Sequence, residues 1–458
     1  MAKSKCKASL LSPMVLTIAG SDPSGGAGLQ QDLRVFSVLG GFGAAVPTAL
    51  TVQNTLGVFD VMPVPVESID MQLQKILEDI PILAAKTGML VNEEIVKKCA
   101  EHLNAFKPEF LVVDPIMYSS NGHVLLDTPG WEAMKEFLMP IADVITPNME
   151  EAEAMWGRPV KDLDDMRAAV IEIQERWKKS AIVVKGGHLG GDTVVDVLCL
   201  PGGEIHEITR KRVKNPNTHG TGCAYSAALT LFLANGLNIV DACKAAAHFM
   251  TLSIKGGFKI GEGTGPVNPL AFLRNEYERA DVLAELDSAW ELLSSYPCRS
   301  LVPEVQINIG YSLPYALDVD DVAAFPGRIV AYGKGVAKVG CPSFGASSHI
   351  ARIILTAMEY DAALRSAMNI RYDEFFLNRA KELGYSVAEF SRADEPSDLK
   401  EKEGSTLIWG IRQAFKEHQG TPDVIFDTGE VGKEPIIRVL GCNPVEVVEK
   451  ALAIGGLK

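Results

Sequence analysis

Short apolar runs alternate with amphipathic segments from residue 14 to about residue 269, and this alternation restricts the fold more than any other feature. The expected buried strands are Met14–Ala19, Ala44–Leu50, Ala84–Gly88, Leu111–Asp114, Val144–Thr146 and Ala181–Lys185. Helices are expected at Leu29–Leu39, Asp70–Ile80 and Asp164–Lys178. Strands that alternate with helices form mostly parallel sheets covered on both faces. We therefore predict an α/β domain over residues 14–270, with ligands bound at the carboxyl ends of its strands.

A second α/β pattern begins at about residue 300. Its expected strands are Glu304–Ile309, Arg328–Tyr332, Ser386–Phe390, Asp423–Asp427 and Pro435–Leu440, and its expected helices are Ser347–Met358, Arg371–Leu383, Ser405–His418 and Pro444–Ile454. A charged surface loop is expected at 394–403. We thus predict an N-terminal tail over 1–13, a first domain over 14–270, a helical connector over 271–299 and a second domain over 300–458.

Composition narrows the class of protein. The net charge of −14 argues against a general nucleic-acid binder, which needs clustered Lys and Arg. No apolar run approaches the length of a membrane-spanning helix, and no signal peptide is evident. Eight cysteines are scattered without a CxxC spacing, so zinc and disulfide frameworks are not expected. We expect a cytoplasmic homo-oligomer that acts on small molecules, with no nucleic-acid or membrane partner.

The most informative motif is Gly220-Thr221-Gly222-Cys223, which opens into an apolar helix pattern. The unpaired amides of a helix start bind anions, which suits the charge that develops during phosphoryl transfer. The helix dipole is expected to lower the pKa of the Cys223 thiol, so that Cys223 could act as a base. The alternative is a glycine-rich turn followed by a buried structural cysteine.

Two polar segments indicate a substrate site. The segment 19–29 is rich in glycine but lacks the lysine and the Ser or Thr of a P-loop. Its Gly20 and Asp22 are therefore expected beside a polar substrate. Gln53 follows the next strand and carries an amide that can both donate and accept.

Two further segments indicate a magnesium ion and the phosphates of a nucleotide. Asn148 and Glu151 lie one helical turn apart after a strand, a spacing that suits a hydrated magnesium ion. The alternative for this pair is a helix cap with acidic residues in the first turn. Lys185 and Gly186 also follow a strand and could place a cation and bare backbone near the nucleotide phosphates, or form only a tight turn.

In this order the motifs resemble the hydroxymethylpyrimidine and hydroxymethylpyrimidine-phosphate kinases of thiamine synthesis, which have the ribokinase-like fold. The resemblance covers roughly residues 14–270 and rests on the segments 20–28, 53–55, 146–148, 185–188 and 217–223. It implies that Gln53 reads the pyrimidine ring and that Asp22 lies beside the substrate pocket. It also implies that Asn148 and Glu151 act through magnesium and that Lys185 meets ATP. Cys223 stands where many ribokinase-like enzymes carry an aspartate base. A pyridoxal or sugar kinase remains an alternative for this domain.

The second domain carries a different polar cluster. Arg328 leads a strand, Lys334 lies between glycines, and the segment 340–349 ends in Ser347, Ser348 and His349 before a helix that carries Arg352. Flexible glycines, hydroxyls at a helix start and cationic groups together suit phosphate or pyrophosphate. The alternative is a helix-cap histidine with an ordinary surface arginine.

Residues 300–458 resemble the archaeal-type thiamine-phosphate synthase domain. The resemblance rests on the segments 334–335, 340–352 and 426–429, and it implies functional roles for Arg328 and His349. Such a domain would join the pyrimidine diphosphate to thiazole phosphate and release pyrophosphate. Related domains act as thiamine-phosphate sensors attached to DNA-binding modules. The sequence shows no such module and keeps Arg328 and His349, which favours catalysis.

Overall fold

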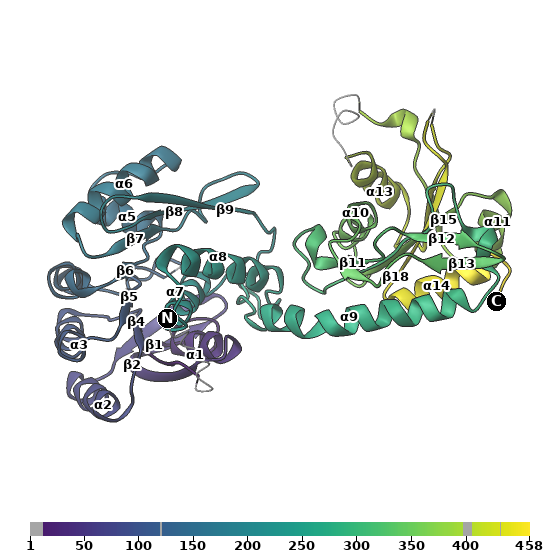
Figure 1. Ribbon diagram of the computed structural model, residues 1–458. Coiled ribbons are helices and arrows are strands. Elements are labelled where there is room, and N and C mark those ends of the chain that lie inside the picture. Colours follow the sequence, from purple (N-terminus) through teal and green to yellow (C-terminus); the bar gives the residue numbers. More distant parts are fainter. Residues whose placement is uncertain (1–11, 120, 397–404, 431) are drawn as a thin grey trace, which may run out of the picture. The chain divides into compact units, whose positions relative to one another are not determined.

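The computed structural model describes residues 12–119, 121–396, 405–430 and 432–458, and the chain forms two compact units, 1–273 and 274–458 (Figure 1). Apart from Ser12 and Pro13, the expected tail 1–13 lies outside the described residues, as does most of the expected charged loop 394–403. Among the described residues, no helix is long and apolar enough to cross a membrane.

The described part of the first unit contains a nine-stranded sheet in the order β3-β2-β1-β4-β5-β6-β7-β8-β9. The strands are β1 (Met14–Ser21), β2 (Phe42–Asn54), β3 (Gly57–Pro63), β4 (Ala84–Thr87), β5 (Phe110–Val113), β6 (Val144–Ile145), β7 (Ala181–Val184), β8 (Thr193–Cys199) and β9 (Ile205–Lys211). Six adjacent strands pair in parallel, in the order β2, β1, β4, β5, β6 and β7. At one edge β3 pairs antiparallel, and at the other edge β8 and β9 pair antiparallel. The carboxyl ends of six parallel strands therefore meet at one edge of the sheet.

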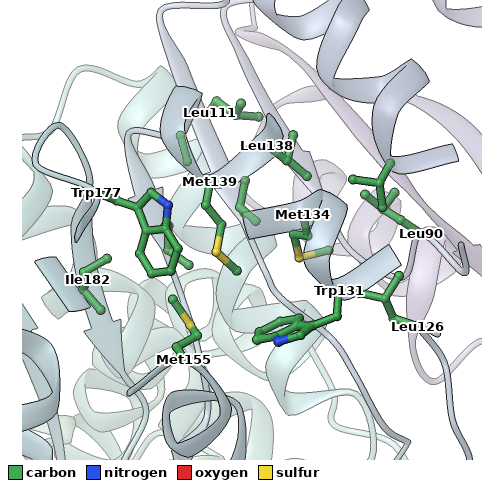
Figure 2. Packing of buried hydrophobic residues seen from close by; sticks show 14 of the residues in the cluster. Leu90, Leu111, Leu126, Trp131, Met134, Leu138, Met139, Met155, Trp177 and Ile182 are labelled. Atoms are coloured by element: carbon green, nitrogen blue, oxygen red, sulfur yellow. The ribbon is translucent and has the colours of Figure 1, made fainter. Parts of the chain in front are cut away.

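Helices cover both faces of this sheet, which confirms the predicted α/β architecture. One face packs against α1 (Gly28–Val38), α7 (Thr221–Ala234) and α8 (Ile239–Lys255). The other packs against α2 (Val66–Asp79), α3 (Glu93–Phe106), α4 (Thr128–Ala133), η1 (Met134–Leu138), η2 (Met139–Ile141), α5 (Met149–Trp156) and α6 (Leu163–Arg176). Figure 2 shows part of this second core, where Trp131, Met134, Met155 and Trp177 pack together. The alternation of side chains along a strand explains the two cores, since Val15 joins one and Leu16 the other.

The second unit contains, among its described residues, a seven-stranded sheet in the order β14-β11-β10-β15-β18-β17-β16 and a separate hairpin, β12-β13. The strands are β10 (Ile309–Ser312), β11 (Val322–Ala324), β12 (Ile329–Tyr332), β13 (Gly335–Lys338), β14 (Ser343–Phe344), β15 (Ser366–Arg371), β16 (Val387–Glu389), β17 (Val424–Asp427) and β18 (Ile436–Gly441). Only β16 and β17 pair in parallel within this described sheet.

The helices of the second unit also lie on two faces. One face carries α10 (Ser348–Ala357) and α13 (Ser405–Glu417), and the other carries α9 (Leu270–Ser294), α11 (Glu374–Glu382) and α14 (Pro444–Ile454). Short turns of helix are η3 (Cys298–Leu301), η4 (Val319–Asp321) and η5 (Arg392–Asp394). The expected connector 271–299 is mainly α9, and its Val282, Leu286, Ala289 and Leu293 are buried in the core of this unit.

The expected strand Glu304–Ile309 is wrong, because the strand begins only at Ile309. Gln306 has a φ of 63°, a left-handed conformation that interrupts an extended strand. The sequence also gave no signal for β15, because Ser366 and Asn369 break its apolar run. Both residues are nevertheless buried, and Asn369 accepts a hydrogen bond from the Asn308 N–H at 2.8 Å.

Candidate active sites in the two units

A cleft of about 630 Å³ lies at the carboxyl edge of the parallel strands in the first unit. It brings together ten of the predicted residues, namely Gly20, Asp22, Gln53, Asn148, Glu151, Lys185, Gly220, Thr221, Gly222 and Cys223. They come from the ends of β1 and β2, the segments after β6 and β7, and the start of α7. The topology thus gathers motifs that lie far apart in the sequence.

The start of α7 forms one end of this site. Gly220 is its N-cap and has a φ of 79°, a conformation that favours glycine. A Cβ atom at this position would lie 1.8 Å from the Gly26 carbonyl oxygen, so the turn also needs the space that glycine leaves. No side chain caps the helix, and the Thr221 N–H donates to the Thr218 carbonyl at 3.3 Å, so the next first-turn amides, those of Gly222 and Cys223, are the ones available to an anion.

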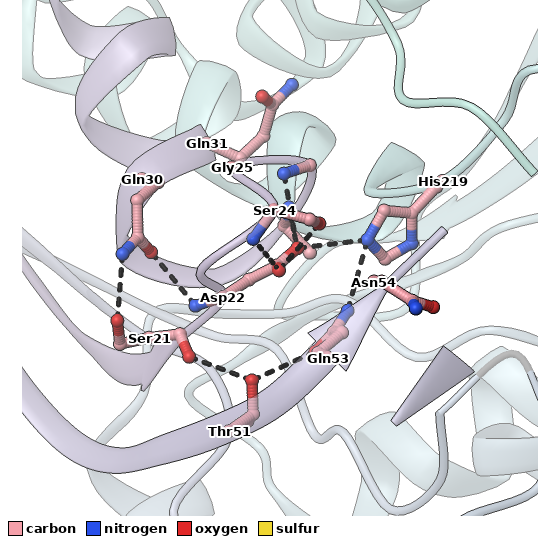
Figure 3. A network of polar contacts seen from close by, with 12 residues as sticks. Ser21, Asp22, Ser24, Gly25, Gln30, Gln31, Thr51, Gln53, Asn54 and His219 are labelled. Carbon is pink, nitrogen blue, oxygen red and sulfur yellow. Dashed lines mark hydrogen bonds and ion pairs between the residues drawn. The ribbon is translucent and has the colours of Figure 1, made fainter. Parts of the chain in front are cut away.

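A polar group around Asp22 forms a second part of the cleft (Figure 3). The buried Asp22 carboxylate accepts hydrogen bonds from the backbone N–H groups of Ser24, Gly26 and Ala27 at 2.8–3.1 Å. Burial alone would raise the pKa of Asp22, but hydrogen bonds from His219 and Ser24 hold it below its usual value. The carboxylate is therefore ionised at neutral pH and fixes the glycine-rich turn.

His219 links Asp22 to Gln53. Its Nε2 lies 3.0 Å from Asp22 Oδ2 and 3.2 Å from Gln53 Nε2. One ring nitrogen cannot donate to the carboxylate and accept from the amide at the same time. When Nε2 carries a proton and donates a hydrogen bond to Asp22, the Gln53 N–H group can donate to a ligand in the cleft instead.

Asp114 and Lys185 form a third part of the cleft. Lys185 Nζ lies 2.9 Å from Asp114 Oδ1, and Asp114 also accepts from Thr146 Oγ1 at 3.0 Å and from Ser226 Oγ at 3.2 Å. A methyl group added at Gly222 would lie 3.6 Å from Lys185 Nζ, which places the ammonium group beside the start of α7. The Lys185 ammonium group therefore lies beside the start of α7 while it pairs with the Asp114 carboxylate.

Asn148 and Glu151 form the helix cap that was the alternative interpretation of this pair. The Asn148 side chain accepts from the Glu151 N–H at 2.8 Å, and Glu151 Oε2 accepts from the Asn148 N–H at 2.7 Å. Burial, together with the nearby charge of Asp114, raises the pKa of Glu151 to about 8, against the opposing effect of Lys185. At neutral pH this carboxyl group is therefore mostly protonated, and a metal cation that binds it displaces the proton.

The Cys223 thiol does not have the lowered pKa expected from its place at a helix start. Burial raises its pKa to about 11, and the charges of Asp32 and Asp114 add to this effect. Lys86 and a hydrogen bond from the Gly28 N–H oppose the shift without reversing it. Lys86 is itself buried and pairs with both carboxylate oxygens of Asp32 at 2.9 Å.

Gly186, predicted with the ATP-binding residues, does not line the cleft. Its N–H donates to Asp196 Oδ1 at 2.9 Å, and a Cβ atom there would lie 1.9 Å from the Val195 carbonyl oxygen. Gly186 thus allows the chain to pack closely against β8.

In the second unit, the predicted His349 and Arg328 lie within one cationic cluster. The pKa of His349 lies well below its usual range, mainly because the surrounding protein partly desolvates the ring. The positive charges of four arginines lower it further, namely Arg438, Arg328, Arg392 and Arg352. Arg328 has a φ of 68°, and its Nη1 donates to the Val305 carbonyl. The buried amides of Asn308 and Asn369 hold the two loops that meet at Arg328.

The remaining predicted residues of this unit lie in two places, at the start of α10 and at the turn of the β12–β13 hairpin. Ser347 is the N-cap of α10 but makes no side-chain cap, and Ser348 is exposed beside it, so both hydroxyls are available to a ligand. Lys334 is exposed at the turn of the β12–β13 hairpin, where its carbonyl accepts from Arg299. Among the described residues, the charges that act most strongly on His349 are those of the four arginines and not that of Lys334.

Sequence reasoning missed several residues of these sites. Asp114 ends the expected strand Leu111–Asp114, and a charged residue at the carboxyl end of a buried strand is a usable signal. His219 lies within the segment 217–223, but the sequence pattern predicted no role for it. Arg438 interrupts the apolar run Ile436–Gly441, and a charge in a buried strand is again a signal.

The comparisons with known proteins agree with both units. The family described as phosphomethylpyrimidine kinase matches residues 22–268, and that described as thiamine-phosphate synthase ThiN matches residues 285–453. A bifunctional thiamine biosynthesis protein, ThiDN, from Methanocaldococcus jannaschii is 32% identical over 445 residues, which cover 96% of this chain and 98% of that protein. A hydroxymethylpyrimidine/phosphomethylpyrimidine kinase from Haemophilus influenzae is 42% identical over 264 residues, 57% of this chain and 97% of the relative.

A solved structure supports the fold of the first unit. Pyridoxal kinase from Staphylococcus aureus, in complex with ADP, is 36% identical, with a TM-score of 0.53, and covers 57% of this chain and 95% of that one. The first unit is thus a ribokinase-like kinase domain. The whole chain belongs to the bifunctional thiamine biosynthesis family, which joins a phosphomethylpyrimidine kinase domain to a thiamine-phosphate synthase domain. The predicted family, fold class and pairing of activities are confirmed.

Proposed function

We propose that the first unit transfers the γ-phosphoryl group of ATP twice. The first acceptor is the hydroxymethyl group of 4-amino-5-hydroxymethyl-2-methylpyrimidine, and the second is the phosphate so formed. The observation that carries this proposal is that one cleft contains both the uncapped start of α7 and the Asp22–His219–Gln53 group. An anion-binding end and a polar end that can read a heteroaromatic ring suit a phosphoryl transfer to a small alcohol.

The amides of Gly222 and Cys223 would hold the transferred phosphoryl group. Negative charge develops on its oxygens in the transition state, and preorganised N–H groups stabilise that charge. Lys185 would add its charge from beside Gly222. Gln53 would hydrogen-bond the edge of the pyrimidine ring, since its amide both donates and accepts.

The two acceptors differ in their need for a base. The hydroxymethyl group must lose a proton as it attacks, whereas the phosphate of the second acceptor is already ionised near neutral pH. Cys223 lines the cleft and would accept this proton in the first step. Because its pKa is about 11, only a small fraction of the thiol is ionised at neutral pH before the substrates bind.

The residues present fit a hydrated magnesium ion held through few protein ligands. Glu151 and Asp114 influence each other electrostatically, and both line the cleft. No group of three or more His, Cys, Asp or Glu side chains suited to a metal occurs among the described residues, which accords with the preference of Mg²⁺ for one or two carboxylates plus substrate phosphates. When bound, the ion would neutralise phosphate charge, and Glu151 and Asp114 would hold it.

The second unit would join the pyrimidine diphosphate to thiazole phosphate. Departure of pyrophosphate leaves a pyrimidinylmethyl cation, which the ring amino group stabilises. Arg328 and His349 would stabilise the leaving group, with the hydroxyls of Ser347 and Ser348 and the charge of Arg352 beside them. Lys334 remains a predicted phosphate ligand at the hairpin turn.

A direct test supplies the full-length protein with pyrimidine diphosphate and thiazole phosphate. Formation of thiamine phosphate supports synthesis, and its loss in His349→Ala supports the role of His349. Ligand binding without any thiamine phosphate would instead make this unit a sensor.

We also propose that the protein is a cytoplasmic homo-oligomer. Strand β2 and the neighbouring edge strand β3 expose Leu50, Val52 and Met62 at 49%, 47% and 51%, and Leu50 pairs directly with Met62. Such an apolar face supports contact with a second copy. The described cysteines form no disulfide, which supports a reducing compartment. Leu50→Lys should lower the molecular mass measured by light scattering, and an unchanged mass would argue against this surface.

A further inference from the structure

One face of the second sheet carries buried charges among apolar side chains. α10 and α13 cover this face, and Ile425 and Leu440 belong to the core beneath them. Asp427 lies two residues after Ile425 on β17, and Arg438 lies two residues before Leu440 on β18. Side chains two residues apart on a strand point to the same face. Asp427 and Arg438 therefore lie on the side of α10, and both are fully buried.

Two arginines share the Asp427 carboxylate. Arg392 Nε lies 2.7 Å from Asp427 Oδ1, and Arg438 Nη2 lies 2.7 Å from Asp427 Oδ2. The Gly429 N–H also donates to this carboxylate at 3.0 Å. One carboxylate neutralises only one guanidinium group, and Arg438 Nε has no hydrogen-bond partner among the described residues. The buried group thus carries an excess positive charge, which is costly unless an anion balances it.

This excess charge acts on the start of α10. His349 feels the charges of Arg438, Arg328, Arg392 and Arg352, and that of Arg438 is the strongest of the four. The four arginines come from the segment before β12, the helix α10, the turn η5 and the strand β18. Separate parts of the chain therefore direct positive charge to one place, where the side chain of His349 remains exposed.

The charge count indicates which anion fits. The four arginines whose charges act most strongly on His349 outnumber the Asp427 carboxylate that two of them share, so positive charge is in excess there. A diphosphate ester carries about three negative charges near neutral pH, whereas a monophosphate ester carries about two. We propose that this cluster binds the diphosphate group of the substrate, and that Asp427 is the positioning residue that holds Arg392 and Arg438 beneath it. The proposal rests on the synthase reaction proposed above, in which a diphosphate is the leaving group.

The first test replaces Arg392 with glutamine in the full-length protein. Arg392→Gln removes one charge near His349 and leaves Asp427 paired with Arg438, so no buried carboxylate loses its partner. We expect the KM for the pyrimidine diphosphate and the Kd for inorganic pyrophosphate to rise about tenfold or more. The KM for thiazole phosphate should change less than about twofold. Pyrophosphate is titrated with excess ADP and Mg²⁺ present, to keep the kinase cleft occupied.

The matched control is Glu359→Gln. Arg412 binds Glu359 with two contacts of 2.9 Å in the same unit, but both side chains are exposed. This variant should leave all the binding constants unchanged. Asp427→Asn adds one net positive charge but releases Arg392 and Arg438, so a positioning role predicts a lower selectivity for pyrophosphate over phosphate. Unchanged selectivity in a folded Asp427→Asn protein would overturn that role.

The outcomes separate the two proposals. An unchanged pyrophosphate Kd in Arg392→Gln, or an equal loss for phosphate and pyrophosphate, overturns the diphosphate site even if thiamine phosphate is made. A selective loss of pyrophosphate binding in a protein that makes no thiamine phosphate upholds the site and refutes the synthase reaction. The thermal midpoint of each variant is measured alongside, since a merely structural role would lower it without selectivity.

Discussion

Oδ2 of Asp22 lies 3.0 Å from Nε2 of His219, although 197 residues separate them in the chain. This contact joins the glycine-rich turn after β1 to the turn that begins α7. Gln53 Nε2 lies 3.2 Å from the same ring nitrogen, so the side chain proposed to read the substrate and the turn proposed to bind the phosphoryl group meet at one histidine.

Replacement of Gln53 with methionine tests whether this amide reads the pyrimidine. We expect kcat/KM for hydroxymethylpyrimidine to fall about tenfold to a hundredfold, because a ring group would lose its hydrogen-bond partner. Pyridoxal is the comparison substrate, since a solved relative is a pyridoxal kinase. An equal loss for both substrates in steady-state assays would show that Gln53 does not discriminate between them.

Replacement of Gly220 with alanine tests the anion-binding turn. The Cβ atom would lie 1.8 Å from the Gly26 carbonyl oxygen, so the turn must shift and both phosphorylations should fall about a hundredfold or more. Gly236 provides a matched control, because it also has a positive φ, of 87°, but nothing lies within 4 Å of its Cβ position. Gly236→Ala should cost only about 1–2 kcal/mol of stability and keep its activity. Full activity in Gly220→Ala would contradict the assigned role of this turn.

Cys223→Ala should reduce the first phosphorylation far more than the second, because only the hydroxymethyl acceptor needs a base. The pH dependence gives an independent measurement. With a pKa of about 11, the thiolate fraction rises with each pH unit above neutrality, so the rate of the first step should rise with pH. The second step should show no such rise, and neither should Cys223→Ala. Equal losses in the two steps would mean that the thiol only shapes the anion site.

Glu151→Gln should change how stability depends on pH. Burial raises the pKa of Glu151 from 4.5 to about 8, so the folded protein holds this proton more tightly than the unfolded chain. Its stabilising contribution is complete below pH 4.5 and is lost as the pH rises to about 8. The variant keeps an oxygen for the helix cap and should unfold at a Tm about 3 °C or more above the unmodified protein at pH 8.5, but not at pH 4. A Tm difference that does not change with pH would rule out the raised pKa.

The same variant should also respond differently to magnesium. If Glu151 helps to hold the ion, Glu151→Gln should raise the magnesium concentration needed for half-maximal phosphorylation about tenfold or more. An unchanged requirement would remove Glu151 from the metal site. Turnover that persists without any divalent ion would contradict the kinase mechanism itself.

The sequence predicted the parallel strands of the first unit well, because each is a buried apolar run followed by polar residues. It predicted less of the second unit, where antiparallel strands carry buried polar residues. Asn369 shows the difficulty, since its amide is satisfied only by the distant Asn308 and Gln306. No local pattern reveals partners that lie more than sixty residues away.

In the candidate sites, too, the features that depend on a local sequence pattern could be predicted, and those that depend on distant residues could not. Glycine-rich turns such as Gly220 are local, and their spacing alone indicated an anion site. Asp114 was missed because its partners Thr146, Lys185 and Ser226 lie 32, 71 and 112 residues away, and only the sheet brings them together. The pKa of Cys223 was misjudged for a related reason. A helix start is visible in a sequence, whereas burial beside two carboxylates is not.

The most direct measurement is a single reaction that contains the full-length protein, hydroxymethylpyrimidine, ATP, Mg²⁺ and thiazole phosphate, sampled over time. The account predicts that the pyrimidine monophosphate appears first, the diphosphate second and thiamine phosphate last, with the release of pyrophosphate. Accumulation of the diphosphate without thiamine phosphate would contradict the synthase half of the account. Failure to phosphorylate the pyrimidine, under conditions in which pyridoxal is phosphorylated, would contradict the kinase half.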